Sequence, residues 1–371
     1  MSIARRRGRV LTLTLTAALA LSLSALAEAQ QYKQTNLVSD LPGATFPDAN
    51  LVNPWGLSRS STSFWWASDN GAGVATLYDG NTGAPQQLVV TIPPAAGGTQ
   101  GVPTGTVFNG TNDFKLPNGN PARFLFVAED GTISGWNGGT MAVLATPADP
   151  DAVYKGAAIA SHRGANYLFV ANFKKGRIDV FDATFTRVRR RHEGHDSDES
   201  SEFAFRDERL PRGFSPFNVQ NIGGSLYVAF AKADAEGHDE VQGAGLGYVD
   251  VFSPGGRLLR RLEHGPWLNA PWGLALAPGD FGAFSHDLLV GQFGSGEIAV
   301  YSVSSGRFLG NVQDDTGATL MIDGLWALSF GNGANAGPVN TLFFTAGIQD
   351  EGHGLFGTLT PVAPAPLGNG Q

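Results

Sequence analysis

Residues 270–312, APWGLALAPGDFGAFSHDLLVGQFGSGEIAVYSVSSGRFLGNV, contain one complete unit of a pattern that fills most of the chain. The stretch predicts four short strands, at residues 272–277, 287–291, 297–302 and 307–312, with Gly and polar turns between them. Apolar, β-branched and aromatic residues suit pleated, half-buried strands of this kind. Four such strands in succession indicate one blade of a β-propeller.

The unit recurs six times. Its first strand is expected at residues 53–57, 103–107, 155–159, 215–219, 270–274 and 322–326. Its second strand is a near-continuous apolar run at residues 64–67, 124–128, 167–171, 226–230, 288–291 and 342–346. The interval from Gly56 to Gly324 gives about 54 residues per unit, which is a blade period. Apolar runs of this kind predict strands covered on both faces by neighbouring blades.

The chain ends supply the ring closure. Units one to five continue into an outer strand, at residues 87–92, 141–146, 186–190, 257–262 and 308–312, whereas the sixth unit stops at Val362. The segment 32–39, YKQTNLVS, precedes the first unit and is available as the missing strand. Pairing it into the last blade removes a free edge. The sequence therefore predicts an all-β, six-bladed propeller of four-stranded blades, closed by an N-terminal strand.

The predicted organisation is a signal peptide at 1–29, a propeller at 30–362 and a flexible tail at 363–371. Arg5, Arg6, Arg7 and Arg9 precede an apolar run at 10–26 and a small-residue cleavage site, as in a bacterial signal peptide. A transmembrane anchor is the alternative, but about 17 apolar residues are short for a span. We therefore expect a secreted or periplasmic protein with no membrane span after cleavage.

Charge and cysteine content narrow the classes of partner. Removing residues 1–29 takes away four Arg and one Glu, and changes the net charge from −8 to −11. Acidic proteins of this kind are not expected to bind nucleic acid, because phosphate neutralisation needs clustered Lys and Arg. No Cys is present, so no disulfide contributes to stability. We expect a monomer stabilised by its core and by ring closure.

A charged insertion at 189–213 interrupts the repeat between units three and four. It begins with three arginines and continues as HEGHDSDE at 192–199. A solvated loop without fixed structure is the favoured interpretation. Metal binding by His192, His195 and Asp196 is the alternative, although such a short run defines no coordination geometry.

Several motifs resemble those of a known group of proteins. They are PWGL at 54–57, NVQNIGG at 218–224, PWGLALAP at 271–278, and DGLW at 323–326 with GNG at 331–333. Together they resemble an uncharacterised family of exported bacterial proteins, over nearly all of residues 33–360. The blade pattern also resembles NHL and SMP-30 type propellers. Many members of the first family end in a PEP-CTERM sorting signal, which this chain lacks, so the resemblance implies release rather than anchoring.

Polar residues that follow the second strands are expected around the channel. In a propeller, the loops after second and fourth strands lie on one face. Oxygen donors from several blades suit Ca²⁺ or another divalent metal, and SMP-30 type hydrolases, by resemblance, hold a metal there as a Lewis acid. The sequence alone establishes no cofactor, because Asp and Asn are also common in tight turns. The candidate metal ligands are Asp69, Glu129, Asn172 and Asp350.

The loop KADAEGHDE at 232–240 is polar, rich in titratable groups and expected to overhang the channel mouth. Its resemblance to a Lys-x-Asp-x-x-x-His-Asp pattern of the exported bacterial family makes it the leading functional loop. Lys232 is a candidate for neutralising a substrate anion, and His238 for a catalytic base. A ligand-holding lid without chemistry, or a plain solvated loop, remains open. The candidate ligand-binding residues are Trp55, Trp272, Trp326, Asp234 and Gln292. The three tryptophans begin first strands, so core packing is their alternative role.

Two functions follow as hypotheses. The first is a binding or scaffold module of the cell envelope or extracellular space, with a small molecule, a glycan or an envelope protein at the channel face. The second is a metal-dependent lactonase or esterase. A lyase, as found on related propellers, is a third. Binding is favoured because no complete catalytic constellation is visible, and fold analogy alone cannot supply an activity.

Overall fold

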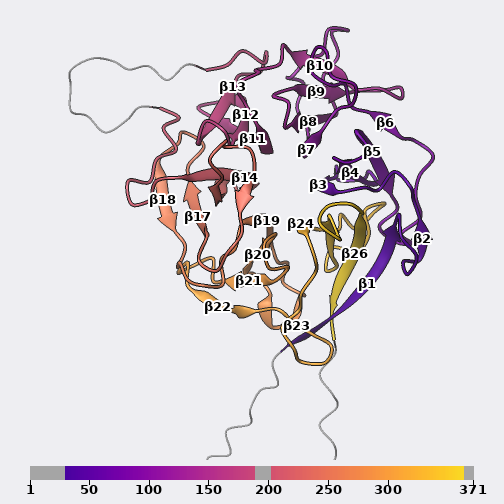
Figure 1. Cartoon of the computed structure of the whole chain (residues 1–371), viewed down its shortest axis with the longest axis vertical. Coiled ribbons are helices and arrows are strands. Elements are labelled where there is room, and N and C mark those ends of the chain that lie inside the picture. Colours follow the sequence, from indigo (N-terminus) through magenta and orange to yellow (C-terminus); the bar gives the residue numbers. More distant parts are fainter. Residues whose placement is uncertain (1–29, 189–201, 363–371) are drawn as a thin grey trace, which may run out of the picture.

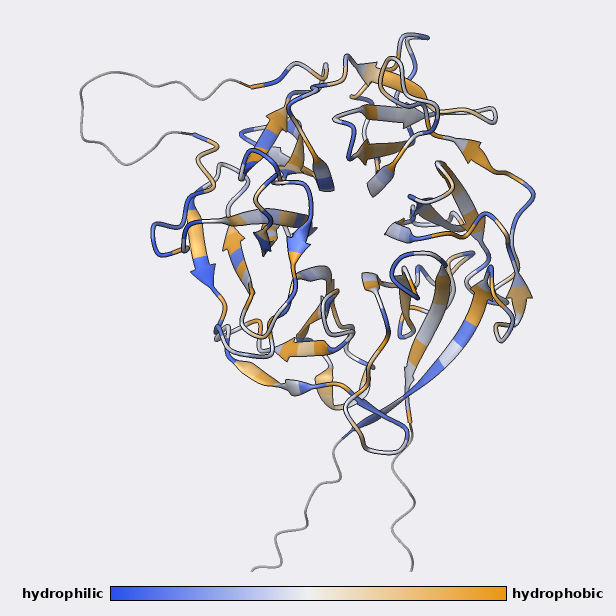
Figure 2. Ribbon diagram, viewed as in Figure 1, coloured by the Kyte–Doolittle hydropathy of each residue, from blue (hydrophilic) through white to orange (hydrophobic). Residues whose placement is uncertain are grey.

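Six sheets surround a central axis in the computed structural model, which describes residues 30–188 and 202–362 (Figure 1). Their strands pair antiparallel, apart from two short parallel pairs in the sheet that joins the chain ends. The prediction of a six-bladed propeller closed by the N-terminal strand is confirmed. The predicted signal peptide (1–29), most of the predicted insertion, with His192, His195 and Asp196, and the predicted tail (363–371) lie outside the described residues. Hydrophobic residues recur along the strands of every blade, as Figure 2 shows.

The first three blades follow the chain in order. Blade 1 contains β3 (Pro54–Ser58), β4 (Trp65–Asp69), β5 (Val74–Tyr78) and β6 (Val90–Thr91). Blade 2 contains β7 (Pro103–Phe108), β8 (Phe124–Ala128), β9 (Ile133–Trp136) and β10 (Val143–Thr146). Blade 3 contains β11 (Tyr154–His162), β12 (Ala165–Asn172) and β13 (Arg177–Phe181). In each blade the first strand lies nearest the axis.

Blades 4 and 6 carry short additional strands, whereas blade 5 has four strands only. Blade 4 contains β14 (Phe214–Ile222), β15 (Ser225–Ala233), β17 (Gly247–Phe252) and β18 (Leu258–Arg261), with β16 (Glu240–Val241) also paired to β15. Blade 5 contains β19 (Pro271–Leu276), a 3-10 turn at Gly282–Phe284, β20 (Leu288–Gln292), β21 (Ile298–Tyr301) and β22 (Phe308–Asn311). Blade 6 contains β24 (Leu325–Phe330), β25 (Leu342–Ala346), β26 (Leu355–Pro361) and β1 (Gln31–Ser39), and β2 (Phe46–Pro47) and β23 (Gln313–Asp314) flank β1.

Blade 3 departs from the four-stranded prediction within the described residues. Its sheet has three strands there, and Arg187 forms only an isolated bridge with Phe181. The predicted outer strand, 186–190, runs into the residues that the structure does not describe. In blades 1, 2, 4 and 5 the outer strand is present but shorter than predicted, because outer strands lie at a sheet edge with one neighbour only.

The antiparallel pair of β1 and β26 closes the ring, and we call this pair and its flanking side chains the closure seam. Tyr32 lies opposite Pro361 at one end and Ser39 opposite Leu355 at the other. Tyr32 is fully buried and donates a hydrogen bond of 2.8 Å to the carbonyl oxygen of Phe281. At the other end, His353 Nδ1 lies 2.6 Å from Asp40 Oδ2. Contacts therefore join residues some 300 positions apart in the chain.

Candidate functional site

An aromatic cluster fills the centre of the ring. Trp55, Trp272 and Trp326 each follow the first residue or two of an innermost strand, and all three are buried. The rings of Trp55 and Trp326 stack with centroids 3.5 Å apart, and the Phe293 ring stacks on Trp326 at 3.9 Å. The tryptophans predicted to bind a ligand thus contact one another and Phe293. Their packing closes the channel below its mouth.

Lys155 occupies the corresponding first-strand position of blade 3. Its side chain is fully buried, and its Nζ atom lies 4.8 Å from the centroid of the Trp55 ring. The same atom donates a hydrogen bond of 2.5 Å to Glu129 Oε1. Burial alone would lower the pKa of this ammonium, but Glu129, Glu240 and Asp239 raise it above its ordinary value. Lys155 is therefore a fixed positive charge at the channel end.

Strand register explains why Glu129 reaches Lys155. Pro54 of β3 lies opposite Asp69, whereas Pro103 of β7 lies opposite Ala128, so Glu129 matches Asn70 rather than Asp69. Successive side chains on a strand point to opposite sides, and a shift of one residue exchanges the two directions. Asn70 Nδ2 accordingly donates a hydrogen bond of 2.9 Å to Glu129 Oε2.

Asp69 and Asn172 occupy the register position one residue before that of Asn70 and Glu129, and their side chains lie inside their own blades. Asp69 is fully buried and accepts a hydrogen bond of 2.8 Å from Thr76 Oγ1. Burial raises the pKa of Asp69 well above its ordinary value. Asn172 Nδ2 donates a hydrogen bond of 2.7 Å to Asp179 Oδ2. The proposed metal set of Asp69, Glu129, Asn172 and Asp350 is therefore not brought together.

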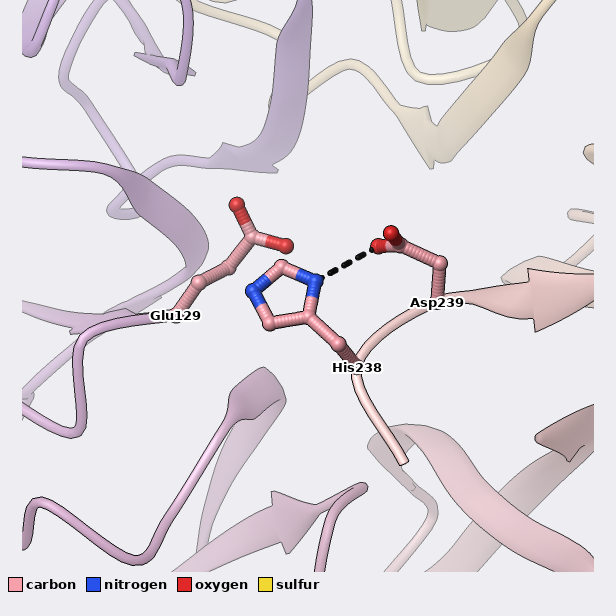
Figure 3. Close-up of side chains that lie close together, drawn as sticks. All are labelled: Glu129, His238 and Asp239. Carbon is pink, nitrogen blue, oxygen red and sulfur yellow. Dashed lines mark hydrogen bonds and ion pairs between the residues drawn. The ribbon is translucent and has the colours of Figure 1, made fainter. Parts of the chain in front are cut away.

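A different acidic group does meet at the mouth. Glu129, His238 and Asp239 each offer one ligating atom, and these atoms lie within 4.8 Å of one another. Figure 3 shows the imidazole ring of His238 between the two carboxylates, with Nδ1 bonded at 2.9 Å to Asp239 Oδ1. Asp239 Oδ1 also lies 3.5 Å from Lys155 Nζ. We call Glu129, Lys155, His238 and Asp239 the mouth cluster.

The loop that carries His238 is shaped by Asp234. The Asp234 carboxylate accepts a hydrogen bond of 2.9 Å from the backbone N–H of His238. Hydrogen bonds from this and neighbouring backbone N–H groups hold the pKa of Asp234 below its ordinary value, although slight burial acts the other way. Asp234 therefore positions the loop, because its carboxylate oxygen closes the turn that carries His238.

Two more carboxylates border the mouth cluster. Burial raises the pKa of Glu240 to about 7, with Lys155 opposing the shift and Glu351 and Asp239 adding to it. Burial also raises the pKa of Glu351, against a hydrogen bond of 2.6 Å from Asn53 Nδ2. Four carboxylates thus surround the single ammonium of Lys155. The carboxylates around Lys155 therefore outnumber its one ammonium.

Asp350 lines a pocket of about 690 Å³ next to Glu351. Gln349, Asp350 and Glu351 all have left-handed backbone conformations, with φ of 56°, 54° and 62°. Such conformations are costly for residues other than Gly and are found where surrounding contacts impose them. Here the Gln349 N–H donates a hydrogen bond of 2.8 Å to Asp323 Oδ2. The turn holds Asp350 and Glu351 beside the channel mouth.

Two other predicted site residues have structural partners. Lys232 Nζ donates a hydrogen bond of 3.2 Å to the carbonyl oxygen of Arg212 and lies over the Phe214 ring. Gln292 is fully buried, and its Oε1 accepts a hydrogen bond of 2.8 Å from the Asn269 N–H. Neither side chain contributes a contact to the mouth cluster.

Sequence reasoning missed Lys155, the centre of the site. A signal was present, since Lys155 is the only charged residue at a first-strand position where other units carry Trp, Phe or Thr. The loop residues Asp239 and Glu240 lay within the stretch already singled out, but their convergence on Lys155 depends on contacts between blades.

No family model matches the chain. It is 30% identical over 332 residues to uncharacterised protein R648 of Acanthamoeba polyphaga mimivirus, covering 85% of this chain and 76% of the relative. It is 31% identical over 328 residues to uncharacterised protein L690 of the same virus, covering 84% and 81%. The resemblance to an exported bacterial family thus finds no support. A solved streptogramin B lyase aligns with a TM-score of 0.51 at 12% identity, covering 90% of this chain and 98% of that one. This similarity supports the propeller fold alone.

The relatives also correct the predicted localisation. We expected a bacterial protein, secreted or periplasmic after signal cleavage, but the similar proteins are viral. A basic start followed by an apolar run is a local compositional pattern, so it was insufficient to establish export. Within residues 30–188 and 202–362, no helix has the length and apolarity to cross a bilayer.

Proposed function

The chain belongs to the family of the mimivirus proteins R648 and L690, and we propose that it is a ligand-binding propeller whose ligand occupies the channel mouth. The observation that carries this proposal is the charge imbalance around Lys155. Glu129, Asp239, Glu240 and Glu351 face one buried ammonium, and burial raises the pKa of Glu240 and Glu351. Shifted groups of this kind cluster at functional sites.

A purely structural role accounts poorly for the imbalance. One carboxylate suffices to pair with Lys155, and every further partly buried carboxylate costs folding free energy. The cost is offset when a ligand supplies the missing positive charge or hydrogen-bond donors. The aromatic cluster below the mouth adds a rigid floor, because its rings are packed against one another. The site is therefore preorganised for a ligand that enters from one face only.

Calorimetric titration with small molecules and with divalent cations tests the proposal. Glu129→Gln and Asp239→Asn should each weaken binding about tenfold or more, because hydrogen bonds to charged groups are worth roughly 1.5–3 kcal/mol. Asp315→Asn is a matched control that removes an exposed carboxylate in the turn after β23. Binding that both mouth variants leave unchanged would place the ligand elsewhere and contradict the proposal.

A metal-dependent hydrolase is the second candidate, and the Glu129, His238 and Asp239 group favours it. One imidazole and two carboxylates suit a transition metal or Zn²⁺ better than Ca²⁺, which takes six to eight oxygens. A bound metal would supply Lewis acidity there. Glu129 and Asp239 would have to divide their charge between the metal and Lys155, which lies 2.5 Å from Glu129 Oε1 and 3.5 Å from Asp239 Oδ1.

Metal content of the purified chain, together with melting temperature before and after chelation, separates the two candidates. About one Zn²⁺ or Mn²⁺ per chain, lost in His238→Ala, supports the hydrolase and justifies a screen of lactones and esters. If the chain takes up no added metal and chelation does not change its melting temperature, the hydrolase is contradicted and the ligand-binding proposal is the one that stands.

A further inference from the structure

A pocket opens beside the mouth cluster, between blades 5 and 6. Its walls come from the loop after β20, the segment before β24 and the turn after β25, together with Gln242 of the blade 4 loop. Its volume of about 690 Å³ is that of a site for a small organic molecule. Glu351 belongs to both the pocket wall and the carboxylate group around Lys155. The pocket is thus continuous with the channel mouth.

The charged wall of the pocket has one sign. Asp323, Asp350 and Glu351 line it, and no basic residue does. Within residues 30–188 and 202–362, none of the three lies within ion-pair distance of a Lys, Arg or His. Asp323 and Glu351 each accept one hydrogen bond, from the Gln349 N–H and from Asn53 Nδ2. Acceptor capacity and negative charge therefore remain available to a ligand.

Two apolar side chains, Met321 and Phe293, also line the pocket. Met321 is 67% exposed, and Phe293, whose ring stacks on Trp326, is 7% exposed. Met is unbranched and polarisable, so it adapts to ligands of different shape. These two apolar side chains distinguish the pocket from a simple ion site, which needs oxygens on several sides.

We propose that this pocket binds an organic cation, a primary amine or an amidine on an apolar body, with its charge at Asp350 and Glu351 and its body against Met321 and Phe293. The inference rests on the proposed function, since it names the ligand class for the same end of the channel. An organic anion would meet three carboxylates, and a neutral molecule would leave them unpaired. A bare metal ion would leave most of the volume and the two apolar side chains without a role.

Matched probes test the charge requirement directly. Benzamidine and phenethylamine carry the cation, and benzamide and 2-phenylethanol are their neutral isosteres. Calorimetric titration should show both cations binding at least about tenfold more tightly than the isosteres, because the charged hydrogen bonds supply the difference. Asp350→Asn and Glu351→Gln should each remove most of that preference, whereas Asp315→Asn should retain it. Circular dichroism and melting temperature establish that the variants are folded.

The outcomes separate this inference from the proposed function. Equal binding of cations and isosteres, or no binding of either cation, overturns the organic-cation assignment. If another ligand then binds and requires Glu129 but not Asp350, the channel-mouth function stands without this pocket. If cations bind and the preference survives in the Asp350→Asn, Glu351→Gln double variant, the pocket assignment is wrong.

Discussion

The closure seam and the channel mouth are both built from residues far apart in the chain, but their polar groups are paired to different extents. At the seam, Ser39 Oγ donates a hydrogen bond of 2.6 Å to the Gly354 carbonyl oxygen. Asp40 accepts from the Gly354 N–H at 2.9 Å and pairs with His353 at 2.6 Å. At the mouth, four carboxylates share the ammonium of Lys155.

The difference indicates what each region contributes. Fully paired polar groups rigidify a junction at little cost, so the seam serves stability. An excess of partly buried carboxylates costs stability, and such a cost is retained at sites that bind or react. Variants of the seam should therefore lower the free energy of unfolding and leave binding unchanged, whereas removing a carboxylate from the mouth should weaken binding.

The largest effect is expected from Tyr32→Ala. Tyr32 is fully buried and packs against the rings of Phe281 and Phe284. Losing the ring should lower the free energy of unfolding by about 3–5 kcal/mol, as for other buried aromatic residues. Urea denaturation measures this value. Tyr32→Phe, which removes only the hydrogen bond to Phe281, should cost about 1 kcal/mol. Equal losses in the two variants would show that ring packing at the seam is unimportant.

The next effect concerns Lys155→Met. Removing one partner of a buried ion pair leaves the other charge unpaired and costs several kcal/mol. Glu129 retains 13% exposure and its bond from Asn70, so we expect a smaller loss, about 2–3 kcal/mol. A double-mutant cycle with Glu129→Gln measures the coupling. Additive losses would show that the 2.5 Å contact contributes nothing specific.

Glu240→Gln should increase stability, and only at higher pH. The pKa of Glu240 is about 7 in the folded chain, above its ordinary value of 4.5. The folded state therefore holds this proton more tightly, so ionisation lowers stability as pH rises from about 4.5 to about 7. At pH 8 the variant should be more stable by about 1–2 kcal/mol, after allowance for partial exposure, with little difference near pH 4. Urea denaturation midpoints of the two proteins at pH 4 and pH 8 test this prediction. A stability difference that is the same at both pH values would contradict it.

The smallest effect is expected from Asp40→Asn. The His353 side chain is 36% exposed, and ion pairs at such positions contribute little. We expect a loss of about 1 kcal/mol, because the amide oxygen can still accept from the Gly354 N–H. Ligand affinity at the mouth should stay unchanged in the same variant. A seam variant that altered affinity would show that the two regions are coupled.

Much of the fold was predictable because each blade repeats a local pattern. The six apolar second strands and the absence of a sixth outer strand predicted the ring and its closure, and β1 pairs with β26 as expected. The site was less predictable. His238 and Glu129 were singled out and do meet, whereas Asp69 and Asn172 point into their blades. A shift of one residue separates the two outcomes, and the apolar runs do not encode it.

By itself, the sequence determined the number of blades, the order of their strands and the segment that closes the ring, because these depend on hydrophobic periodicity and turn residues along the chain. Only the tertiary structure decided which polar residues face the axis. Lys155, Glu129 and Asp239 belong to blades 3 and 2 and to the loop of blade 4, and Glu351 belongs to blade 6. These charges raise the pKa of Lys155, and act on the pKa of Glu351, only because ring closure brings the segments within a few ångströms, and no local pattern carries that information.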